Sequence, residues 1–522
     1  MLTKIRVENY KSFKEAEIPI KPITILLGAN SSGKSSMLQL LLLLQQTAEV
    51  ASYESALKIY GKRISMGKPE NLFYKKDSKK PFCIQIDFNN EHLKNYLIDA
   101  LKSYLGPFRL SFRLLSNKKI DIGSKRVDFE EALDTIINKK NPLLSRLPEL
   151  SDYYISSSDL TRQGIPSLIS TYDFLKQLYN IKSPSFSFTY TVSFSNEQLL
   201  VSAFSFKNND VSILSYSKGV FYSDITELKD TDQASLNEAL LQDSTIFNIF
   251  GKRENIKKSP NGNETSLSKT MINLITKGLS ILQDEFKEPF INHVGPLRAH
   301  PQRYYMLDKA NVTYSLDTFD ANAIAEVIKD KPQLKERVNT WFKQFGLEVT
   351  VDVFKEVIHK LTVSQSSLDL DIPDVGFGVS QVLPVVLQGF LSPSSSVTIV
   401  EQPEIHLHPK MQAALADLFI DITKESGFTK HLLIETHSEY LLRRLRRRMA
   451  QGDGEDKGIS PNIVSINLFH TRTNDEPATI ENIPIENKGA FQWPHEYYDD
   501  ELHADVVDFL KLQANGNIHS ND

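Results

Sequence analysis

Hydrophobic residues follow two periods in the middle of this chain. Residues 185–195 (SFSFTYTVSFS) alternate strictly between polar and apolar side chains, and residues 199–206 and 211–222 continue in a strand-like manner. Residues 127–138 and 165–179 instead repeat their apolar side chains about every 3.6 positions, the period of an α-helix. The two patterns predict helices followed by strands, that is, a compact α+β region.

Three apolar runs elsewhere are short and continuous, which is typical of buried strands. They cover residues 23–27, 397–400 and 431–434. A glycine-containing loop follows the first run, an acidic pair follows the second, and a Thr-His-Ser triplet at residues 436–438 follows the third. The carboxyl ends of neighbouring strands in an α/β sheet share one edge, where ligands bind. We therefore expect one site to be assembled from opposite ends of the chain.

The loop after the first run matches a phosphate-binding pattern. Residues 28–35 read GANSSGKS, a full match to GxxxxGK[ST], and an apolar, helix-forming segment begins at Met37. Such a loop points backbone N–H groups at phosphates, its lysine adds positive charge and its last serine ligates Mg²⁺. The predicted ligands are ATP and Mg²⁺, with Ser35 on the metal and nucleotide contacts from Asn30, Ser31, Ser32, Gly33, Lys34, Ser35 and Ser36.

The acidic strand end supplies the second half of the predicted site. Carboxylates at this place hold Mg²⁺ and a water against the nucleotide phosphate in P-loop ATPases. Glu401 is the predicted metal ligand, and His437 at the end of the next run can reach the γ-phosphate. An ordinary acidic turn and a hydrogen-bonded structural histidine are the alternatives. The predicted catalytic residues are Glu401, Gln402, Glu404 and His437.

A zinc site is an alternative interpretation of the same segment. His406 and His408 alternate as metal ligands do, and Glu404 lies close by in the sequence. The segment lacks the remaining ligands of a zinc site, and the ATPase interpretation already accounts for it.

The order of these motifs resembles ABC-type ATPases of the SMC, recombination-repair and OLD branch. The resemblance rests on the P-loop, on the glycine-serine turn DVGFGVSQVLP at residues 374–384, on the acidic strand end and on His437. The opening KIRVENYKSFKEAEI at residues 4–18 is similar to the first hairpin of that branch. Residues 1–90 and 290–480 carry the resemblance.

The resemblance implies an α/β fold, namely an ABC-type P-loop ATPase head with a mixed sheet flanked by helices. Residues 1–90 and 290–480 would form the two halves of the head, residues 91–289 an α+β insertion, and residues 481–522 an acidic tail element. No heptad repeat is sustained, which argues against a long coiled coil. In this family the glycine-serine turn caps ATP on a second subunit, which implies self-association through Gly378 and Ser380.

Position 402 departs from the family pattern. Most ABC-type ATPases place an Asp for Mg²⁺ and then a Glu that orients water, whereas this chain has Glu401 and Gln402 there. Glutamine can position water but cannot accept a proton. Glu404 could act as the base, Gln402 could merely position water in slow turnover, or hydrolysis could be almost absent. Slow hydrolysis with an unassigned base is the favoured prediction.

A narrower resemblance is to a subset of bacterial ATPases. It rests on residues 290–298 (FINHVGPLR), 375–384 (VGFGVSQVLP), 401–409 (EQPEIHLHP) and 491–494 (FQWP). Such ATPases are often encoded in antiphage defence systems, for example of the Septu and PARIS types, where an ATPase subunit works with a separate nuclease. The resemblance implies an oligomeric switch that controls an effector, either a nuclease or a toxin, and the single cysteine fits a cytoplasmic protein.

Composition limits the other functions. The net charge is −5 and there is one cysteine, so nucleic acid would need a local basic patch, and a cysteine-rich zinc site is excluded. Five arginines between Arg443 and Arg448 form one such patch, or else a solvated helix paired with acidic neighbours. A DNA-repair or DNA-scanning ATPase is therefore the rival function. The large insertion and the lack of an LSGGQ motif disfavour a transporter motor.

Two further functions are not expected. The most hydrophobic run, residues 37–44, is far shorter than the roughly 20 residues that span a bilayer, so no membrane contact is predicted. A Toprim-type nuclease domain would need on the order of 100 residues after the head. The segment after His437 is too short to complete the head and also hold that domain, and it lacks the acidic motif set. No built-in nuclease is expected.

Overall fold

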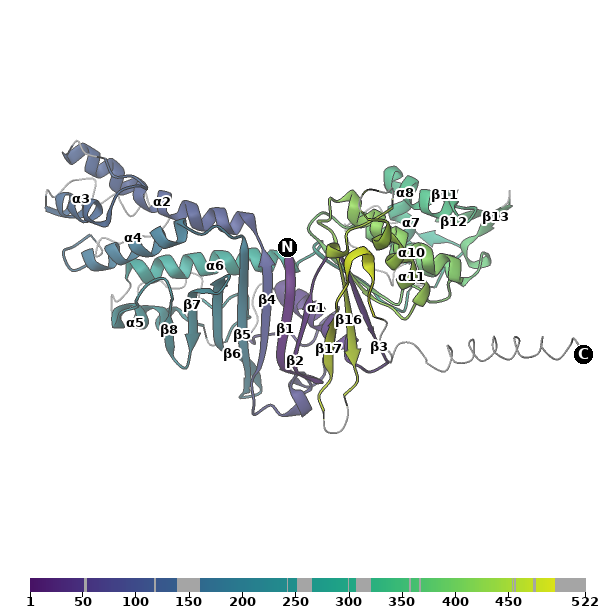
Figure 1. Ribbon diagram of the computed structural model, residues 1–522, viewed down its shortest axis with the longest axis horizontal. Helices are drawn as coiled ribbons and strands as arrows, with labels where there is room; N and C mark the ends of the chain where they lie inside the picture. Colours follow the sequence, from purple (N-terminus) through teal and green to yellow (C-terminus); the bar gives the residue numbers. More distant parts are fainter. Residues whose placement is uncertain are drawn as a thin grey trace, which may run out of the picture. The chain divides into compact units, whose positions relative to one another are not determined.

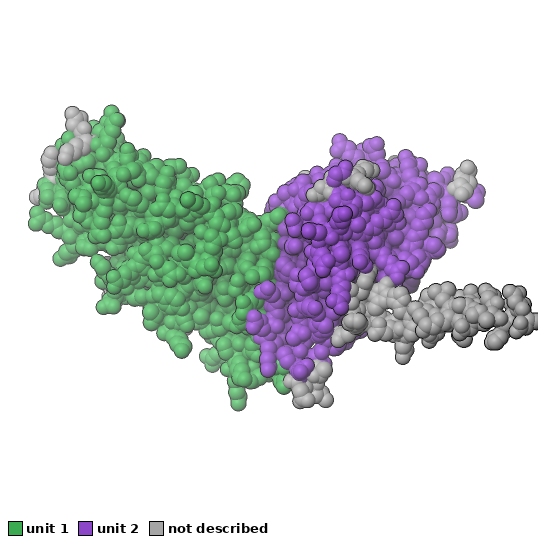
Figure 2. Space-filling model, viewed as in Figure 1, with its two compact units in different colours: residues 1–11, 43–286 green, residues 12–42, 287–522 purple. Residues whose placement is uncertain are grey.

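Two compact units make up the chain in the computed structural model. Unit 1 comprises residues 1–11 and 43–286, and unit 2 comprises residues 12–42 and 287–522 (Figure 2). The domain boundaries at residues 90, 289 and 480 stay predictions. The structure describes residues 1–50, 54–116, 119–138, 160–241, 243–250, 265–298, 300–306, 321–355, 358–365, 368–452, 454, 457–472 and 476–492. Residues 481–492 of the predicted tail lie inside these ranges, and residues 493–522, with Trp493 and Pro494, lie outside them.

Unit 1 combines an antiparallel sheet with helices (Figure 1). Its strands follow the order β1-β4-β5-β6-β7-β8, each antiparallel to the next. They are β1 (Leu2–Tyr10), β4 (Phe82–Asn89), β5 (Ser185–Ser195), β6 (Gln198–Asn208), β7 (Val211–Ser217) and β8 (Val220–Tyr222). The helices are α2 (Glu91–Ser116), α3 (Arg126–Asn138), α4 (Ile165–Tyr179), α5 (Asp230–Ala239) and α6 (Ser266–Phe286), with short 3₁₀ turns η1 (Pro69–Leu72) and η2 (Tyr74–Lys76).

Aromatic side chains join the sheet of unit 1 to a helix. The alternation in β5 buries Phe188, whose ring stacks 4.4 Å from that of Phe206 on β6. A Cβ at Gly278 of α6 would lie 3.4 Å from the Phe188 ring, which is van der Waals contact, so this helix packs directly on the aromatic side chains of the sheet. The predicted helices and strands of this region are confirmed, because the alternating apolar positions could be buried only against another layer.

Unit 2 is built on a mixed sheet of order β17-β16-β3-β15-β14-β9. Figure 1 labels β17, β16 and β3 of this sheet. β16, β3, β15, β14 and β9 are parallel, and β17 is antiparallel to β16. Buried aliphatic side chains on both faces explain the continuous apolar runs. The strands are β3 (Ile23–Gly28), β9 (Ile291–Val294), β14 (Val397–Glu401), β15 (His431–Glu435), β16 (Val464–His470) and β17 (Thr479–Ile483), with β2 (Phe13–Pro19) contacting β17.

Helices and a second, smaller sheet share one hydrophobic core with this mixed sheet. The small sheet has the order β10-β12-β11, and β13 pairs with β12. Its strands are β10 (Tyr305–Met306), β11 (Leu347–Lys355), β12 (Ile358–Gln365) and β13 (Leu368–Asp371). The helices are α7 (Ala321–Asp330), α8 (Pro332–Lys343), α9 (Phe377–Leu391), α10 (Pro409–Glu425) and α11 (Glu439–Gln451), with 3₁₀ turns η4 (Ile372–Asp374), η5 (Pro461–Ile463) and η6 (Asn487–Gly489).

The architecture confirms the predicted α/β class with a P-loop. Helix α1 (Lys34–Ala48) begins inside the phosphate-binding loop, as the apolar segment after it predicted. The longest helix in the described ranges is α2, with 26 residues, so that part of the chain holds no long coiled coil. None of the helices described is both long and apolar enough to cross a bilayer.

Candidate active site

Two glycines shape the P-loop, one at the end of β3 and one directly before α1. Gly28 has φ +137° and Gly33 has φ +104°, values that side chains rarely permit. A Cβ at Gly28 would lie 2.4 Å from the Phe469 carbonyl oxygen, and one at Gly33 would lie 2.5 Å from the Phe13 ring. Both the backbone conformation and the available space therefore require glycine.

Lys34 connects this loop to the neighbouring strand β15. Its amine donates hydrogen bonds to the carbonyl oxygens of Gly28 (2.9 Å) and Ala29 (2.8 Å), and lies 3.7 Å from Glu435 Oε1. Burial lowers the pKa of Lys34, and the charge of Glu435 opposes that shift. The predicted phosphate-binding charge is thus held at the end of β3.

The remaining P-loop residues differ in exposure. Asn30, Ser31 and Ser35 are exposed, and the role of Ser35 as a metal ligand stays a prediction. Ser32 is buried, and its hydroxyl has no hydrogen-bond partner among the residues described. Mg²⁺ characteristically takes one or two carboxylates together with phosphate oxygens and waters rather than an all-protein cage. Ser35 and Glu401 fit this type of Mg²⁺ coordination. The described ranges contain no group of three acidic, histidine or cysteine side chains that could hold a metal ion.

Glu435 is a site residue that the sequence analysis missed. The sheet register places it beside Leu26 of β3 and beside Glu401 of β14. It is 5% exposed, and Oε2 has no partner in the described structure. Burial raises the pKa of Glu435; Lys34 opposes this shift, and Glu401 and Glu404 reinforce it. The acid at the end of the apolar run HLLIE was the available signal, because buried acids are rare without a partner.

Glu401 is fixed by two residues from the segment at 290–298. Its Oε1 lies 2.6 Å from His293 Nε2. The buried guanidinium of Arg298 donates to the carbonyl oxygens of Glu401 (2.8 Å) and of Gln381 in α9 (3.0 Å). Burial lowers the pKa of Arg298 to about 10, while Glu404 and Glu401 oppose the shift. From the sequence, this segment was identified only by its resemblance to a family, and no role was predicted for His293 or Arg298.

Glu404 holds the turn that follows β15. Oε1 accepts a hydrogen bond from the His437 backbone N–H at 2.6 Å, and Oε2 accepts one from the Thr436 hydroxyl at 2.8 Å. Burial raises the pKa of Glu404, and these hydrogen bonds oppose the shift. Both carboxylate oxygens are thus already engaged in placing His437.

Gln402 and His437 flank this turn. Gln402 has φ +44°, a strained value for a side chain of its size, and its backbone N–H donates to the Glu435 carbonyl oxygen at 2.8 Å. His437 is exposed, while Ser438 caps the start of α11. Partial desolvation, with a smaller effect of Lys34, lowers the pKa of His437 and favours the neutral imidazole.

The glycine-serine turn presents the start of α9. Gly376, with φ +97°, is the exposed residue that precedes the helix. Gly378 lies in the first turn, where a Cβ would come 2.8 Å from the His406 carbonyl oxygen. Ser380 is only 6% exposed, so its side chain is turned into unit 2. The exposed residues of the turn therefore precede Ser380 in the sequence.

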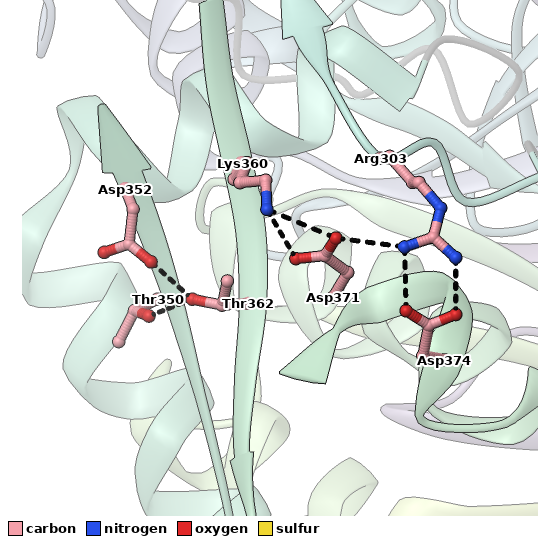
Figure 3. Close-up of polar contacts among 7 residues, drawn as sticks. All are labelled: Arg303, Thr350, Asp352, Lys360, Thr362, Asp371 and Asp374. Carbon is pink, nitrogen blue, oxygen red and sulfur yellow. Dashed lines mark hydrogen bonds and ion pairs between the residues drawn. The ribbon is translucent and has the colours of Figure 1, made fainter. Parts of the chain in front are cut away.

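An ionic network anchors the segment before this turn (Figure 3). Arg303 contacts both carboxylate oxygens of Asp374, at 2.9 and 2.8 Å, and Asp371 at 3.2 Å. Lys360 of β12 contacts the same Asp371 at 3.1 Å. The network ties η4 to the small sheet and so restricts the entry into α9.

The alternative zinc site at His406, His408 and Glu404 receives little structural support. His408 Nδ1 accepts a hydrogen bond from the Lys410 backbone N–H, which caps α10, and His406 is exposed. Together with Glu404 these histidines form no metal-ligating group in the part of the chain that is described.

The arginines of α11 contact groups within the protein. Arg444 and Arg448 bind Asp417 of α10, each at 2.6 Å, and Arg443 pairs with Glu439. The Arg446 guanidinium lies 5.4 Å from the centre of the Phe491 ring. The arrangement agrees with a solvated helix that is paired with acidic neighbours.

Similarity to known proteins identifies the family of this chain. Similar solved structures include an SMC head bound to the C-terminal winged-helix domain of ScpA (12% identity, TM-score 0.37, covering 93% of this chain and 98% of that one) and the SMC head domain from Thermotoga maritima (8%, 0.36, 93% and 99%). No curated protein matches the sequence. The model of the AAA ATPase domain family matches residues 1–442. Because this match spans most of the chain, the chain belongs to the AAA ATPase domain family.

Proposed function

We propose that this chain is an ABC-type ATPase that works as a nucleotide-dependent switch. The observation that carries the proposal is the shared edge of three parallel strands, where Lys34, Glu435 and Glu401 meet. ATP would bind along the P-loop from Asn30 to Ser36. Mg²⁺, when bound between Ser35 and Glu401, would neutralise phosphate charge.

Slow hydrolysis follows from the groups that face this edge. Gln402 cannot accept a proton, and both oxygens of Glu404 already accept hydrogen bonds. Glu401, oriented by His293, is itself a predicted metal ligand, and the buried Glu435 pairs with Lys34. His437 supplies a neutral imidazole that can donate a hydrogen bond to the γ-phosphate. The ATP-bound state would therefore persist long enough to act as a signal.

Two heads would sandwich the nucleotide. The first turn of an α-helix has N–H groups without intrahelical partners and the positive end of the helix dipole, so the exposed start of α9 suits a phosphate of the partner's ATP. Because Ser380 is buried, we assign this contact to the backbone between Gly376 and Gly378 rather than to the serine hydroxyl. Gly378 retains its predicted place at the nucleotide of the second subunit.

The switch would control a separate effector, a nuclease or a toxin, in bacterial antiphage defence within the cytoplasm. The support is the narrower resemblance of residues 290–298, 375–384 and 401–409. Direct action on DNA is the rival function. The contacts that Arg443, Arg444 and Arg448 make with acidic side chains disfavour it.

Nucleotide binding, phosphate release and oligomeric state test the proposal in one set of proteins. Lys34→Ala should abolish ATP binding, whereas Glu401→Gln should retain binding and lose turnover. Glu401→Gln should also accumulate a dimer with ATP, seen by light scattering, and retain a second polypeptide on gentle purification. Full turnover in Glu401→Gln would refute the site. DNA binding that weakens with salt and is lost on replacing Arg447, an exposed member of the arginine group, would favour the rival function.

A further inference from the structure

A cavity of about 1000 Å³ lies within unit 1 and uses none of the residues of the candidate active site. Its walls come from four segments: residues 54–60, residues 68–70 at the start of η1, residues 194–199 at the β5–β6 turn, and residues 241–248. The volume is at the upper end of the range for ligand sites. Several neighbouring side chains of one partner could therefore enter together.

Backbone hydrogen bonds hold the walls in place. The Ala56 N–H donates to the Leu199 carbonyl oxygen at 2.7 Å, and the Ile246 N–H donates to the Ala56 carbonyl oxygen at 3.1 Å. The Leu241 N–H donates to the Ile249 carbonyl oxygen at 2.9 Å. Because three of the wall segments are tied together in this way, the cavity is formed before any ligand binds.

The lining is strongly acidic. Glu54, Glu70, Glu197 and Asp243 contribute four carboxylates, against the single amine of Lys68. Glu70 Oε2 is buried and has no hydrogen-bond partner in the described structure. A buried carboxylate oxygen without a partner costs free energy, which a cationic donor would recover. The charge therefore favours a cation and repels phosphates, so nucleic acids and anionic membranes are unsuitable occupants.

Apolar and aromatic side chains share the rest of the wall with neutral polar residues. Tyr60 is 52% exposed and Leu241 is 38% exposed, although both are large hydrophobic residues, and Phe194 adds a second aromatic ring. An aromatic ring beside carboxylates suits arginine more than lysine, because a planar guanidinium can stack on the ring and bind a carboxylate through two N–H groups. The exposed aliphatic surface suits an apolar neighbour of that arginine.

We propose that this cavity binds a segment of a partner protein in which arginine alternates with apolar side chains. The inference rests on the proposed function, since the effector would be the protein that carries the segment. It adds the chemistry of the contact: arginine to Glu70 and to the exposed acids, and aliphatic side chains to Tyr60 and Leu241.

Fluorescence anisotropy with a labelled hexapeptide, Ala-Leu-Arg-Leu-Arg-Ala, tests this on the full-length protein. Saturable binding should weaken at least tenfold in the double variant Glu197→Lys, Asp243→Lys, and several-fold in Glu70→Gln. Asp134→Lys is the matched control, because Asp134 is an exposed acid of α3 that does not line the cavity, and it should bind as the wild type does. A peptide with glutamate in place of arginine should not bind.

Three results would overturn the inference. The first is that the wild-type protein shows no saturable binding, and the second is that the double variant binds the peptide as tightly as the wild type does. The third is that arginine amide competes as effectively as the unlabelled peptide, which would indicate a small cationic ligand instead. Phosphate release is measured on the same preparations. Retained ATP turnover without peptide binding would refute the docking site alone, whereas peptide binding without ATP turnover would refute the proposed function alone.

Discussion

Glu401 and His293 lie on neighbouring parallel strands, with the carboxylate Oε1 2.6 Å from the imidazole Nε2. The register pairs Ile399 with His293, and Glu401 projects from the same face of the sheet two residues later. The two residues are 108 positions apart in the chain. The acid that we expect at the metal is thus oriented by a residue on a neighbouring strand that lies far from it in the sequence.

Replacing His293 should separate nucleotide binding from hydrolysis. We expect His293→Ala to retain ATP affinity and to lose turnover by about tenfold or more, which is the scale of misplacing one catalytic group. His293→Gln, which keeps a donor near the same place, should recover part of the rate. His92→Ala, at an exposed position of α2, is the control. Equal turnover in His293→Ala and the wild type would show that Glu401 does not need this contact.

Arg298 should be irreplaceable by lysine. Arg298 reaches the carbonyl oxygens of Gln381 and Glu401 through two separate nitrogens of a planar fork, which lysine lacks, so one buried acceptor loses its partner. We expect Arg298→Lys to lower the free energy of unfolding by about 2 kcal/mol, the cost of such an acceptor, and to reduce turnover. Denaturation curves and phosphate release provide the measurements. The control is Arg113→Lys, at an exposed position of α2. An unchanged denaturation midpoint would contradict the expectation.

Alanine substitutions at two glycines with positive φ would distinguish the effect of backbone strain from that of a steric clash. Gly28→Ala would bring a Cβ within 2.4 Å of the Phe469 carbonyl oxygen, whereas no atom lies within 4 Å of a Cβ at Gly427. We expect Gly28→Ala to reduce ATP affinity at least tenfold. Gly427→Ala should cost only about 1–2 kcal/mol of stability and leave ATP binding intact. Isothermal titration with ATP and Mg²⁺ distinguishes the two, and similar affinities would show that the P-loop can relax.

His437 should make stability depend on pH. Its folded pKa is lowered below the ordinary 6.5 by desolvation and by Lys34, so the unfolded chain binds a proton more readily. Neutral His437 therefore favours folding above pH 6.5, and this contribution is lost as the pH falls through the lower folded value. Between pH 7 and 5 the melting temperature of the wild type should fall faster than that of His437→Gln. Parallel melting curves would contradict this, and His92→Gln is the control.

Local patterns could predict the elements, but tertiary contacts determined the details of the site. Strict alternation predicted β5 over residues 185–195, and the GxxxxGK[ST] pattern predicted the loop into α1. Ser380 shows the limit, because the pattern could not tell which residues of the turn stay exposed. Helix α9 buries the face that carries Ser380, so the exposed residue before the helix is Gly376.

The sequence by itself determined that the chain has a P-loop, a buried strand ending in acids, and a histidine after a third strand. These features are local, since each needs only the residues next to it in the chain. Only the tertiary structure decided that Glu435 lies beside Lys34, that His293 and Arg298 fix Glu401, and that both oxygens of Glu404 are engaged. The physical reason is that strand order and register bring together segments hundreds of residues apart, and no local pattern encodes that pairing.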